Sequence, residues 1–277
     1  MRRVKRCCIG FALTLSMLLA GPLLLAACAG FQDTESWRTA DRSSARIAPS
    51  PEQEKAAVVQ VYAARAFSWR GYFAVHTWIS TKAAGASHYY VHDVTGWRHY
   101  VVQSRPGEPD RAWFGSEPTV IADFRGEQAE KIINQLDGVI EKYPYPTTYK
   151  AWPGPNSNTF VAWVIRQIPE MEVALPSHAI GKDYLGDGLV SEVPGGSGYQ
   201  FSLGGYFGLL AGVREGLELN ILGLSLGVNP LALGIKLPGI GDLALRNTNP
   251  MAEASEPALE PNAKETAEAG RVSQKTL

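Results

Sequence analysis

Cysteine is nearly absent from this chain of 277 residues. Its cysteines are Cys7, Cys8 and Cys28, so no thiol occurs beyond residue 30. The rest of the chain therefore has no disulfide framework and no cysteine nucleophile. Any nucleophile beyond residue 30 must be a side chain of another type.

An excess of charge is also lacking, because 26 lysines and arginines balance 27 aspartates and glutamates. Proteins that bind nucleic acid normally present a clustered basic face, so we expect no nucleic-acid partner. The glycine-rich stretches "VPGGSGYQ" and "LGGYFG" lack the Lys-Ser or Lys-Thr ending of a phosphate-binding loop. We expect no cofactor.

Histidine is scarce, with five residues in the chain. His88, His92 and His99 are close enough in sequence to suggest a zinc site. The intervening Tyr89 and Tyr90 favour a strand, in which residues four apart lie about 13 Å apart, too far to share one ion. We therefore expect no metal site.

One long apolar run is present, from residue 7 to residue 30, and it is rich in leucine and alanine. It is long enough to span a bilayer as an uncleaved helix, and basic residues before it would keep its start in the cytoplasm. These basic residues are Arg2, Arg3, Lys5 and Arg6. Residues 1–30 are therefore predicted to be an export or anchor segment, with a membrane as partner.

Cleavage is the alternative to an uncleaved anchor. Leu25, Ala26, Ala27 and Cys28 resemble the lipobox of bacterial lipoproteins, in which the cysteine thiol takes a diacylglyceryl group. In bacteria with two membranes, Ala29 after that cysteine favours passage to the outer membrane. We favour a lipoprotein on the periplasmic face of the outer membrane, with an inner-membrane anchor as the alternative.

Composition divides the remaining chain into three parts. Residues 31–54 are polar, without a sustained period, and are predicted to be a tether. Residues 55–246 contain enough apolar side chains for one core and are predicted to form a single domain. Residues 247–277 lack an apolar period and are predicted to be a disordered tail.

Hydrophobic periodicity predicts both strands and helices within the domain. Alternation predicts a strand at residues 73–79, and residues 82–86 are typical of a hairpin connection to a second strand at 88–94. A third strand is predicted at 97–102, before the turn residues of 105–109. A one-sided apolar stripe predicts a helix over residues 125–142. A further helix is predicted over residues 157–168, and because it is apolar on nearly all sides we expect it at the centre of the domain.

The glycine- and leucine-rich stretch of residues 185–246 predicts further β structure. Leu217, Leu219 and Ile221, at odd positions, alternate with polar residues. From Leu222 on, the leucines occupy even positions instead. This change predicts a bulge or a turn. The stretch could be a packed sheet or a surface that rests on lipid, and we expect the packed sheet.

The stretch "AWPGPNSNTF" changes from loop chemistry to helix chemistry at Ser157. Asn156 or Ser157 could cap the helix by accepting a hydrogen bond from a first-turn amide. The same helix start could hold a nucleophile, because its free amides and dipole stabilise developing negative charge. Ser157 would then need a base, and His76 in "YFAVHTWIS" is the best candidate.

Two further groups of residues have ordinary explanations. Tyr149, Trp152 and Trp163 could line a groove, and they could equally belong to the core. Lys182, Asp183 and Asp187, in "GKDYLGDG", are more typical of a turn with a local ion pair than of a site.

Four stretches, "FAVHTWI", "AWPGPNSNTFVAW", "LPSHAIGKDYL" and "EGLELNILGLSLGVNPL", resemble an uncharacterised bacterial family of membrane-anchored or lipoprotein domains. The resemblance covers about residues 36–245, and that domain of unknown function implies no activity. A more distant similarity is to the circularly permuted papain-like superfamily. This superfamily includes lecithin retinol acyltransferase and hydrolases of envelope lipids or peptidoglycan.

The papain-like resemblance implies a set of site residues. In that superfamily a strand histidine comes first, a polar residue on the next strand orients it, and an Asn-Cys-x-x-Phe segment opens the central helix. His76 matches the first element, and residues 156–160 match the last, with Ser157 in place of the cysteine. A hydroxyl is less acidic than a thiol, so the same geometry would activate it less readily.

The orienting residue could be His88, His92 or Asp93, because the sequence does not set the register of their strand. Of these we choose His92. The oxyanion would be held by amides at the helix start, together with Asn156 or Asn158.

We therefore expect an α+β domain in which a largely antiparallel sheet packs on a central helix, as in a permuted papain-like fold, followed by a Gly/Leu-rich β part. The expected function is a cell-envelope hydrolase or acyltransferase acting on an ester or amide of lipid or peptidoglycan. Ser157 would attack the carbonyl, and His76 would take and return the proton. The alternative is a non-catalytic lipoprotein that binds lipid or glycan in the same cleft. The sequence identifies no protein partner.

Overall fold

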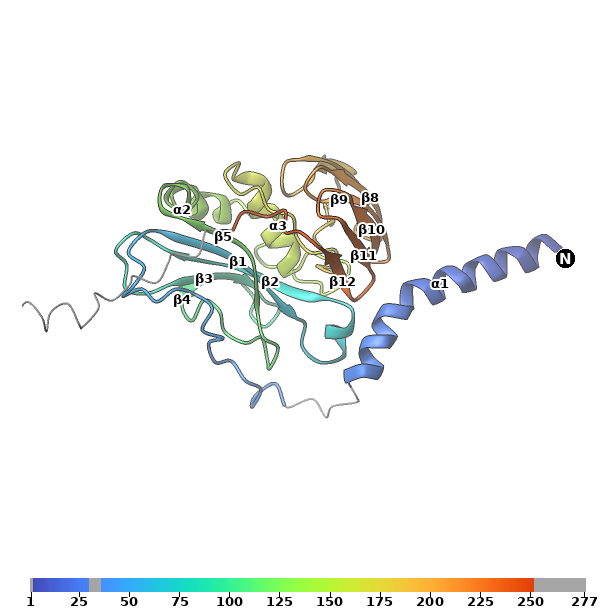
Figure 1. The fold of residues 1–277 in the computed structure, drawn as a ribbon, viewed down its shortest axis with the longest axis horizontal. Helices are drawn as coiled ribbons and strands as arrows, with labels where there is room; N and C mark the ends of the chain where they lie inside the picture. The colour runs from blue at the N-terminus through green and yellow to red at the C-terminus, as the bar shows by residue number, and fades with distance from the viewer. Residues whose placement is uncertain (1, 30–35, 252–277) are drawn as a thin grey trace, which may run out of the picture.

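The structure is a computed structural model, and it describes residues 2–29 and 36–251 (Figure 1). Its helices are α1 (Arg2–Ala29), α2 (Gly126–Glu141), α3 (Ser157–Gln167) and the 3-10 helix η1 (Ser68–Tyr72). The first sheet contains β1 (Val58–Arg65), β2 (Val75–Lys82), β3 (Tyr90–Val94), β4 (Val102–Pro106) and β5 (Thr119–Arg125). The second sheet contains β6 (Val190–Glu192), β7 (Gly198–Leu203), β8 (Phe207–Gly212), β9 (Gly216–Ile221), β10 (Leu224–Asn229), β11 (Gly234–Leu237) and β12 (Gly241–Ala244). The described residues thus form an α+β fold with two antiparallel sheets.

The first sheet has the strand order β4-β3-β2-β1-β5, and two helices cover one of its faces. α2 packs on β1 and β5, whereas α3 packs on β2 and β3. Both helices were predicted, and their bounds agree to within one residue at each end. α3 lies between the two sheets (Figure 1). Phe160, Val161 and Ile165 of α3 are buried in the main core, as expected for a central helix.

The strands predicted at residues 73–79 and 88–94 overlap β2 and β3, but the prediction of a strand at 97–102 is wrong. A turn occupies most of that stretch, and β4 begins only at Val102. β4 is an edge strand, and Pro106 at its end pairs with Tyr90 of β3. An edge position suits proline, because the N–H group that proline lacks is not needed for a strand on the other side.

The second sheet is a meander in which each strand pairs with the next one along the chain. β9 and β10 are joined at Leu222 and Gly223, which have φ angles of 54° and 83°. Two successive positive φ angles are typical of the type I′ turn that joins tight hairpins. The turn predicted from the change of parity at Leu222 is thus confirmed.

The second sheet packs on the domain through its polar face. Gln200, Glu218, Asn220, Ser225 and Lys236 are all buried on that side. The alternating leucines and valines point the other way and are exposed or half-buried. The second sheet is therefore packed against the domain on one face, as expected. The packed face is the polar one, and the apolar face points outward.

The helix α1 is long and apolar enough over Ile9–Cys28 to cross a membrane, as is also true of a signal sequence. Its second half lies against the domain, where Leu18, Gly21 and Pro22 are buried. A Cβ atom on Gly21 would collide with the carbonyl oxygen of Pro238, which shows how closely the two backbones approach. Cys28 is exposed.

Parts of the predicted tether and tail, residues 31–35 and 252–277, lie outside the described residues. The rest of the tether contacts the domain through Asp110. Ser44 Oγ donates to Asp110 Oδ1 at 2.6 Å, and the backbone amide of Ala48 donates to Asp110 Oδ2 at 2.9 Å.

Four charged side chains form a buried cluster under the second sheet. Lys182 Nζ lies 2.8 Å from Asp183 Oδ1 and 2.7 Å from Glu218 Oε2, and Lys236 contacts the other oxygen of Glu218. Burial alone would lower the pKa of Lys182, but the two carboxylates outweigh it and raise that pKa. Burial alone would raise the pKa of Glu218, but the two ammonium groups hold it below its ordinary value. The ion pair expected of Lys182 and Asp183 is therefore present, within a larger network.

We predict that Lys182→Met lowers the free energy of unfolding by about 3–5 kcal/mol, because it leaves Asp183 and Glu218 buried without their shared cation. Urea unfolding of the detergent-solubilised chain measures this loss. The matched control is Lys131→Met, which removes an exposed ion pair with Glu127 and should leave the urea midpoint unchanged. Equal midpoints for both variants would contradict a structural role for the cluster.

Candidate functional site

Asn156 is the N-cap of α3. Its side-chain oxygen accepts hydrogen bonds from the backbone amides of Asn158 at 2.9 Å and Thr159 at 3.2 Å. In return, the backbone amide of Asn156 donates to Thr159 Oγ1 at 3.1 Å. This reciprocal arrangement is a capping box. Of the two residues that sequence reasoning offered as the cap, the structure assigns the role to Asn156 and leaves Ser157 as the first helical residue.

Asn158 joins the start of α3 to β2 and to the loop after the helix. Its oxygen accepts from Thr77 Oγ1 at 2.9 Å, and its Nδ2 donates to the carbonyls of Val75 at 3.0 Å and Ile180 at 2.7 Å. Asn156 Nδ2 donates to the same Ile180 carbonyl at 2.9 Å. The side-chain N–H groups of both asparagines therefore donate to backbone carbonyls. In this arrangement neither side chain has a free N–H group for the oxyanion that it was expected to bind.

Ser157 is left free by this arrangement. Neither its hydroxyl nor its backbone amide makes a hydrogen bond within the part of the chain that the structure describes. The hydroxyl is not among the buried polar atoms without a partner, so it stays accessible. Ser157 thus presents one hydroxyl and one amide N–H at the positive end of a helix, where both can contact a bound group.

His76 lies on β2 between Val75 and Thr77, the two residues that Asn158 holds. Its ring stacks on Trp113 with a centroid separation of 3.5 Å and an interplanar angle of 11°. Nε2 is buried without a partner. Burial lowers the pKa of His76 to about 3, opposed by the charge of Asp93. The imidazole is therefore neutral at ordinary pH, and the protonated form that a general base must reach is disfavoured.

Ser157 and His76 border one cavity, but no hydrogen bond joins them in the described structure. In β2, Val75 packs in the core beneath α3, whereas His76 stacks with Trp78 and Trp113 on the opposite side of the strand. The cavity reaches both residues around the end of the strand. The expected pair thus shares a space without direct contact.

His92, the residue chosen to orient His76, is bound elsewhere. Its Nε2 lies 2.9 Å from Thr81 Oγ1, and its Nδ1 lies 2.9 Å from Ser104 Oγ. Burial lowers the pKa of His92 to about 4. Because both ring nitrogens have partners in the first sheet, His92 has a structural explanation, and no hydrogen bond links it to His76.

The two other candidates for the orienting role also lie apart from the His76 ring nitrogens. Asp93 is buried and binds Arg105 Nη1 at 2.7 Å and Arg111 Nη2 at 2.9 Å. The Arg111 guanidinium in turn lies 5.5 Å from the Trp113 ring centroid. Asp93 therefore acts on His76 through charge, across this stack. His88 is exposed beside Tyr90.

The cavity that Ser157 and His76 share has a volume of about 650 Å³, within the range of small-molecule sites. We call it the aromatic cavity, because eight of its twenty lining residues are aromatic. These are Phe67, Trp69, Phe73, Trp97, Trp113, Phe114, Tyr149 and Trp152. Asn156, Ser157 and Asn158 lie on its wall, and within the part of the chain that the structure describes Arg70 is the only permanently charged residue that lines it. Of the aromatic residues of this wall, sequence reasoning identified only Tyr149 and Trp152, whereas Trp163 packs against the core.

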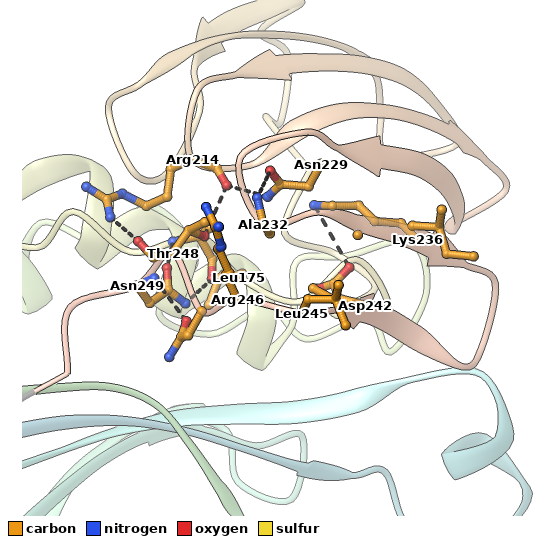
Figure 2. Close-up of a pocket in the computed structure, with 15 residues that line it drawn as sticks. Leu175, Arg214, Asn229, Ala232, Lys236, Asp242, Leu245, Arg246, Thr248 and Asn249 are labelled. Carbon is orange, nitrogen blue, oxygen red and sulfur yellow. Dashed lines mark hydrogen bonds and ion pairs between the residues drawn. The ribbon is translucent and has the colours of Figure 1, made fainter.

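A smaller cavity of about 280 Å³ lies at the end of the second sheet (Figure 2). Its polar groups bind one another. Arg214 Nη1 donates to the carbonyl of Thr248, Asn229 Nδ2 donates to the Arg214 carbonyl at 2.7 Å, and Lys236 lies 3.9 Å from Asp242. These bonds tie the end of the domain to the second sheet, so this cavity has a structural explanation.

The histidines weighed as metal ligands do not converge. Among the residues that the structure describes, no three His, Cys, Asp or Glu side chains gather closely enough to hold a metal ion.

We predict that Asn158→Ala destabilises the protein by about 1–3 kcal/mol, because it removes this partner from the Thr77 hydroxyl and the Val75 carbonyl and leaves the Ile180 carbonyl with the Asn156 amide alone. Ser157→Ala is the matched control at the neighbouring position. It should change the free energy of unfolding by no more than about 0.5 kcal/mol, since Ser157 binds nothing. Chemical unfolding of both variants measures the difference, and an equal loss would mean that Ser157 is also a structural residue.

Comparison with known proteins gives one finding. Residues 56–184 match the family model described as "Protein of unknown function (DUF3750)". The match includes the first sheet, α2, α3 and most of the aromatic cavity, and it ends before the second sheet. No curated protein and no solved structure matches the chain. Over residues 56–184 the chain is thus similar to an uncharacterised family of domains of unknown function.

Proposed function

We propose that the aromatic cavity binds the apolar part of a lipid, and that the protein is a membrane-anchored lipid-binding domain of the cell envelope. The observation that carries the proposal is the cavity wall. Eight aromatic side chains line about 650 Å³, and Arg70 is the one permanently charged residue among the described residues of the lining. Such a wall favours an apolar ligand through burial of its surface.

The polar groups of the cavity wall come from the start of α3 and from Arg70 of η1. The free amide and hydroxyl of Ser157 can donate to a carbonyl oxygen, and Arg70 can pair with an anionic group. A glycan would need hydrogen bonds along its whole length, which this wall does not offer. An acyl chain that ends in an ester or carboxylate matches both parts of the cavity.

The location of the cavity supports a membrane ligand. η1, which carries Trp69 and Arg70 of the wall, packs against α1. A ligand leaving the bilayer near α1 would therefore reach the cavity without crossing much water. Anchoring belongs to the same proposal, either by α1 as an uncleaved helix or by a diacylglyceryl group on Cys28 in the periplasm.

We predict that the protein binds a fluorescent fatty acid and that Ala74→Phe weakens this binding about tenfold, because overfilling a packed site costs about 1–3 kcal/mol. Ala74 borders the cavity, whereas the matched control Ala83→Phe is exposed in the turn after β2. Fluorescence titration in detergent below its critical micelle concentration measures both affinities. Binding of soluble peptidoglycan fragments in place of the fatty acid would contradict the lipid proposal.

A second candidate function is catalysis by Ser157, in the manner of a permuted papain-like hydrolase or acyltransferase. It is favoured by one observation, the free hydroxyl at the helix start in a cavity that also contains His76. Ser157 Oγ would add to an ester or amide carbonyl, His76 would take its proton and pass it to the leaving group, and water or an alcohol would release the acyl group. The His76 ring would first have to turn from its stack on Trp113.

We predict for this candidate that a fluorophosphonate probe labels the protein and that Ser157→Ala and His76→Gln each abolish labelling. Because the pKa of His76 is held near 3, its neutral form persists at higher pH, and labelling should stay level between about pH 5 and 8. Gel fluorescence of the labelled protein measures this. A folded wild type that takes no label would leave lipid binding without catalysis.

A further inference from the structure

The second sheet has an apolar outer face that nothing in the described structure covers. Cross-strand pairs place its side chains on one surface, such as Leu209 beside Leu219 and Leu217 beside Val228. Its exposed members include Tyr199, Leu203, Leu209, Leu217, Val228, Ile235 and Leu243, with Leu217 55 % exposed. From β7 to β12 no charged residue lies on this face.

The charged and polar residues of these strands lie on the inner face. Glu218 and Lys236 alternate with Leu217 and Ile235 along β9 and β11, and both belong to the buried ion cluster. The sheet is therefore inverted relative to a sheet that faces water, in which polar side chains point outward. Exposed apolar patches of this kind mark contact with a protein or a membrane.

The occupant is indicated by α1. Met17 of α1 borders an apolar hollow of about 850 Å³ on the outer face, together with Leu209, Leu217 and Ile235. In Figure 1, α1 leaves the domain on the side of β8 to β11, and its first half extends away from the domain. A bilayer that holds the apolar half of α1 before Met17 must lie next to this face.

Aromatic residues at the edge of the outer face are consistent with a bilayer next to it. Trp152 and Tyr206 pack edge to face at the β9–β10 end of the sheet, and both are partly exposed. Trp69 is exposed on η1, which packs against α1. Tryptophan and tyrosine are enriched where a protein meets the boundary between lipid and water.

We propose that the outer face of β7 to β12 rests on the bilayer that α1 enters, with its leucines and valines in the apolar part of the membrane surface. The backbone groups of the inner strands are paired with neighbouring strands, so contact with lipid leaves them satisfied. The face is continuous with the mouth of the aromatic cavity, because Leu222 and Leu224 of the β9–β10 hairpin line that cavity. The proposal is independent of what the cavity binds.

The experiment measures the depth of single fluorescent labels in proteoliposomes. The full chain, with Cys7, Cys8 and Cys28 replaced by serine, receives one NBD label at Leu209→Cys or Leu217→Cys. Glu130→Cys on α2 is the control away from the bilayer, and Ile9→Cys on α1 reports that the chain is inserted. Vesicles contain phosphatidylethanolamine and phosphatidylglycerol, with or without lipid that carries a doxyl group on its acyl chain.

We expect doxyl lipid to quench most of the fluorescence at Leu209→Cys and Leu217→Cys, as at Ile9→Cys, and to leave Glu130→Cys unquenched. Quenching at Ile9→Cys alone would overturn the proposal, because the anchor would be inserted with the sheet away from lipid. Energy transfer between labelled copies at Leu217→Cys, without lipid quenching, would also overturn it and assign the face to a second copy of the chain. Two label positions protect the test against one variant that fails to fold.

Discussion

The attachment of the α3 N-terminus to the edge of β2 is the constraint on which the site depends. Asn158 holds the Val75 carbonyl, the Thr77 hydroxyl and the Ile180 carbonyl at once. The first two groups are buried and the third is partly buried, so each needs a partner, and the Asn158 side chain binds all three. The result is a rigid corner at which helix, strand and loop meet. The free groups of Ser157 and the ring of His76 border the same cavity because this corner sets their positions.

The polar residues predicted for the site are thus explained mostly by structure. Asn156 caps α3, and Asn158 joins the start of α3 to β2 and to the loop after the helix. His92 bridges Thr81 and Ser104. What remains without a structural role is Ser157. A buried serine with no partner at a helix start is poised to contact a ligand, whether or not it reacts with one.

The second sheet has its polar side chains paired inside the domain and its apolar side chains outside. Its polar face is satisfied inside the domain by the cluster around Glu218, which leaves the apolar face for the outside. Exposure of this apolar face to water is unfavourable, and its contact with lipid is favourable. The aromatic cavity opens beside the β9–β10 hairpin of this sheet, so a lipid-facing sheet and a lipid-binding cavity would form one continuous apolar path.

Local patterns predicted the helices and the hairpin well. α2 and α3 carry strong apolar periodicity, and the change of parity at Leu222 marks a real turn, because these features depend on residues near in sequence. β4 was placed too early, since Trp97, Tyr100 and Val101 are residue types common in strands, although the first two are exposed in a turn.

The cavity could not be predicted in the same way. Its wall combines η1, the loop before β4, the stretch around Trp113 and the start of α3, and no spacing in the sequence relates these segments. The stack of His76 on Trp113 and the face of β2 on which it lies depend equally on register and long-range packing.

The most direct test of lipid binding in the aromatic cavity is photocrosslinking in the membrane. The full chain is reconstituted with a phospholipid that carries a diazirine near the carbonyl end of one acyl chain, irradiated, and digested for mass spectrometry. The account predicts crosslinks on peptides that contain Trp97, Trp113 or Ser157, and their loss when free fatty acid is added in excess. Crosslinks confined to α1 and the second sheet, with none on the cavity wall, would contradict it.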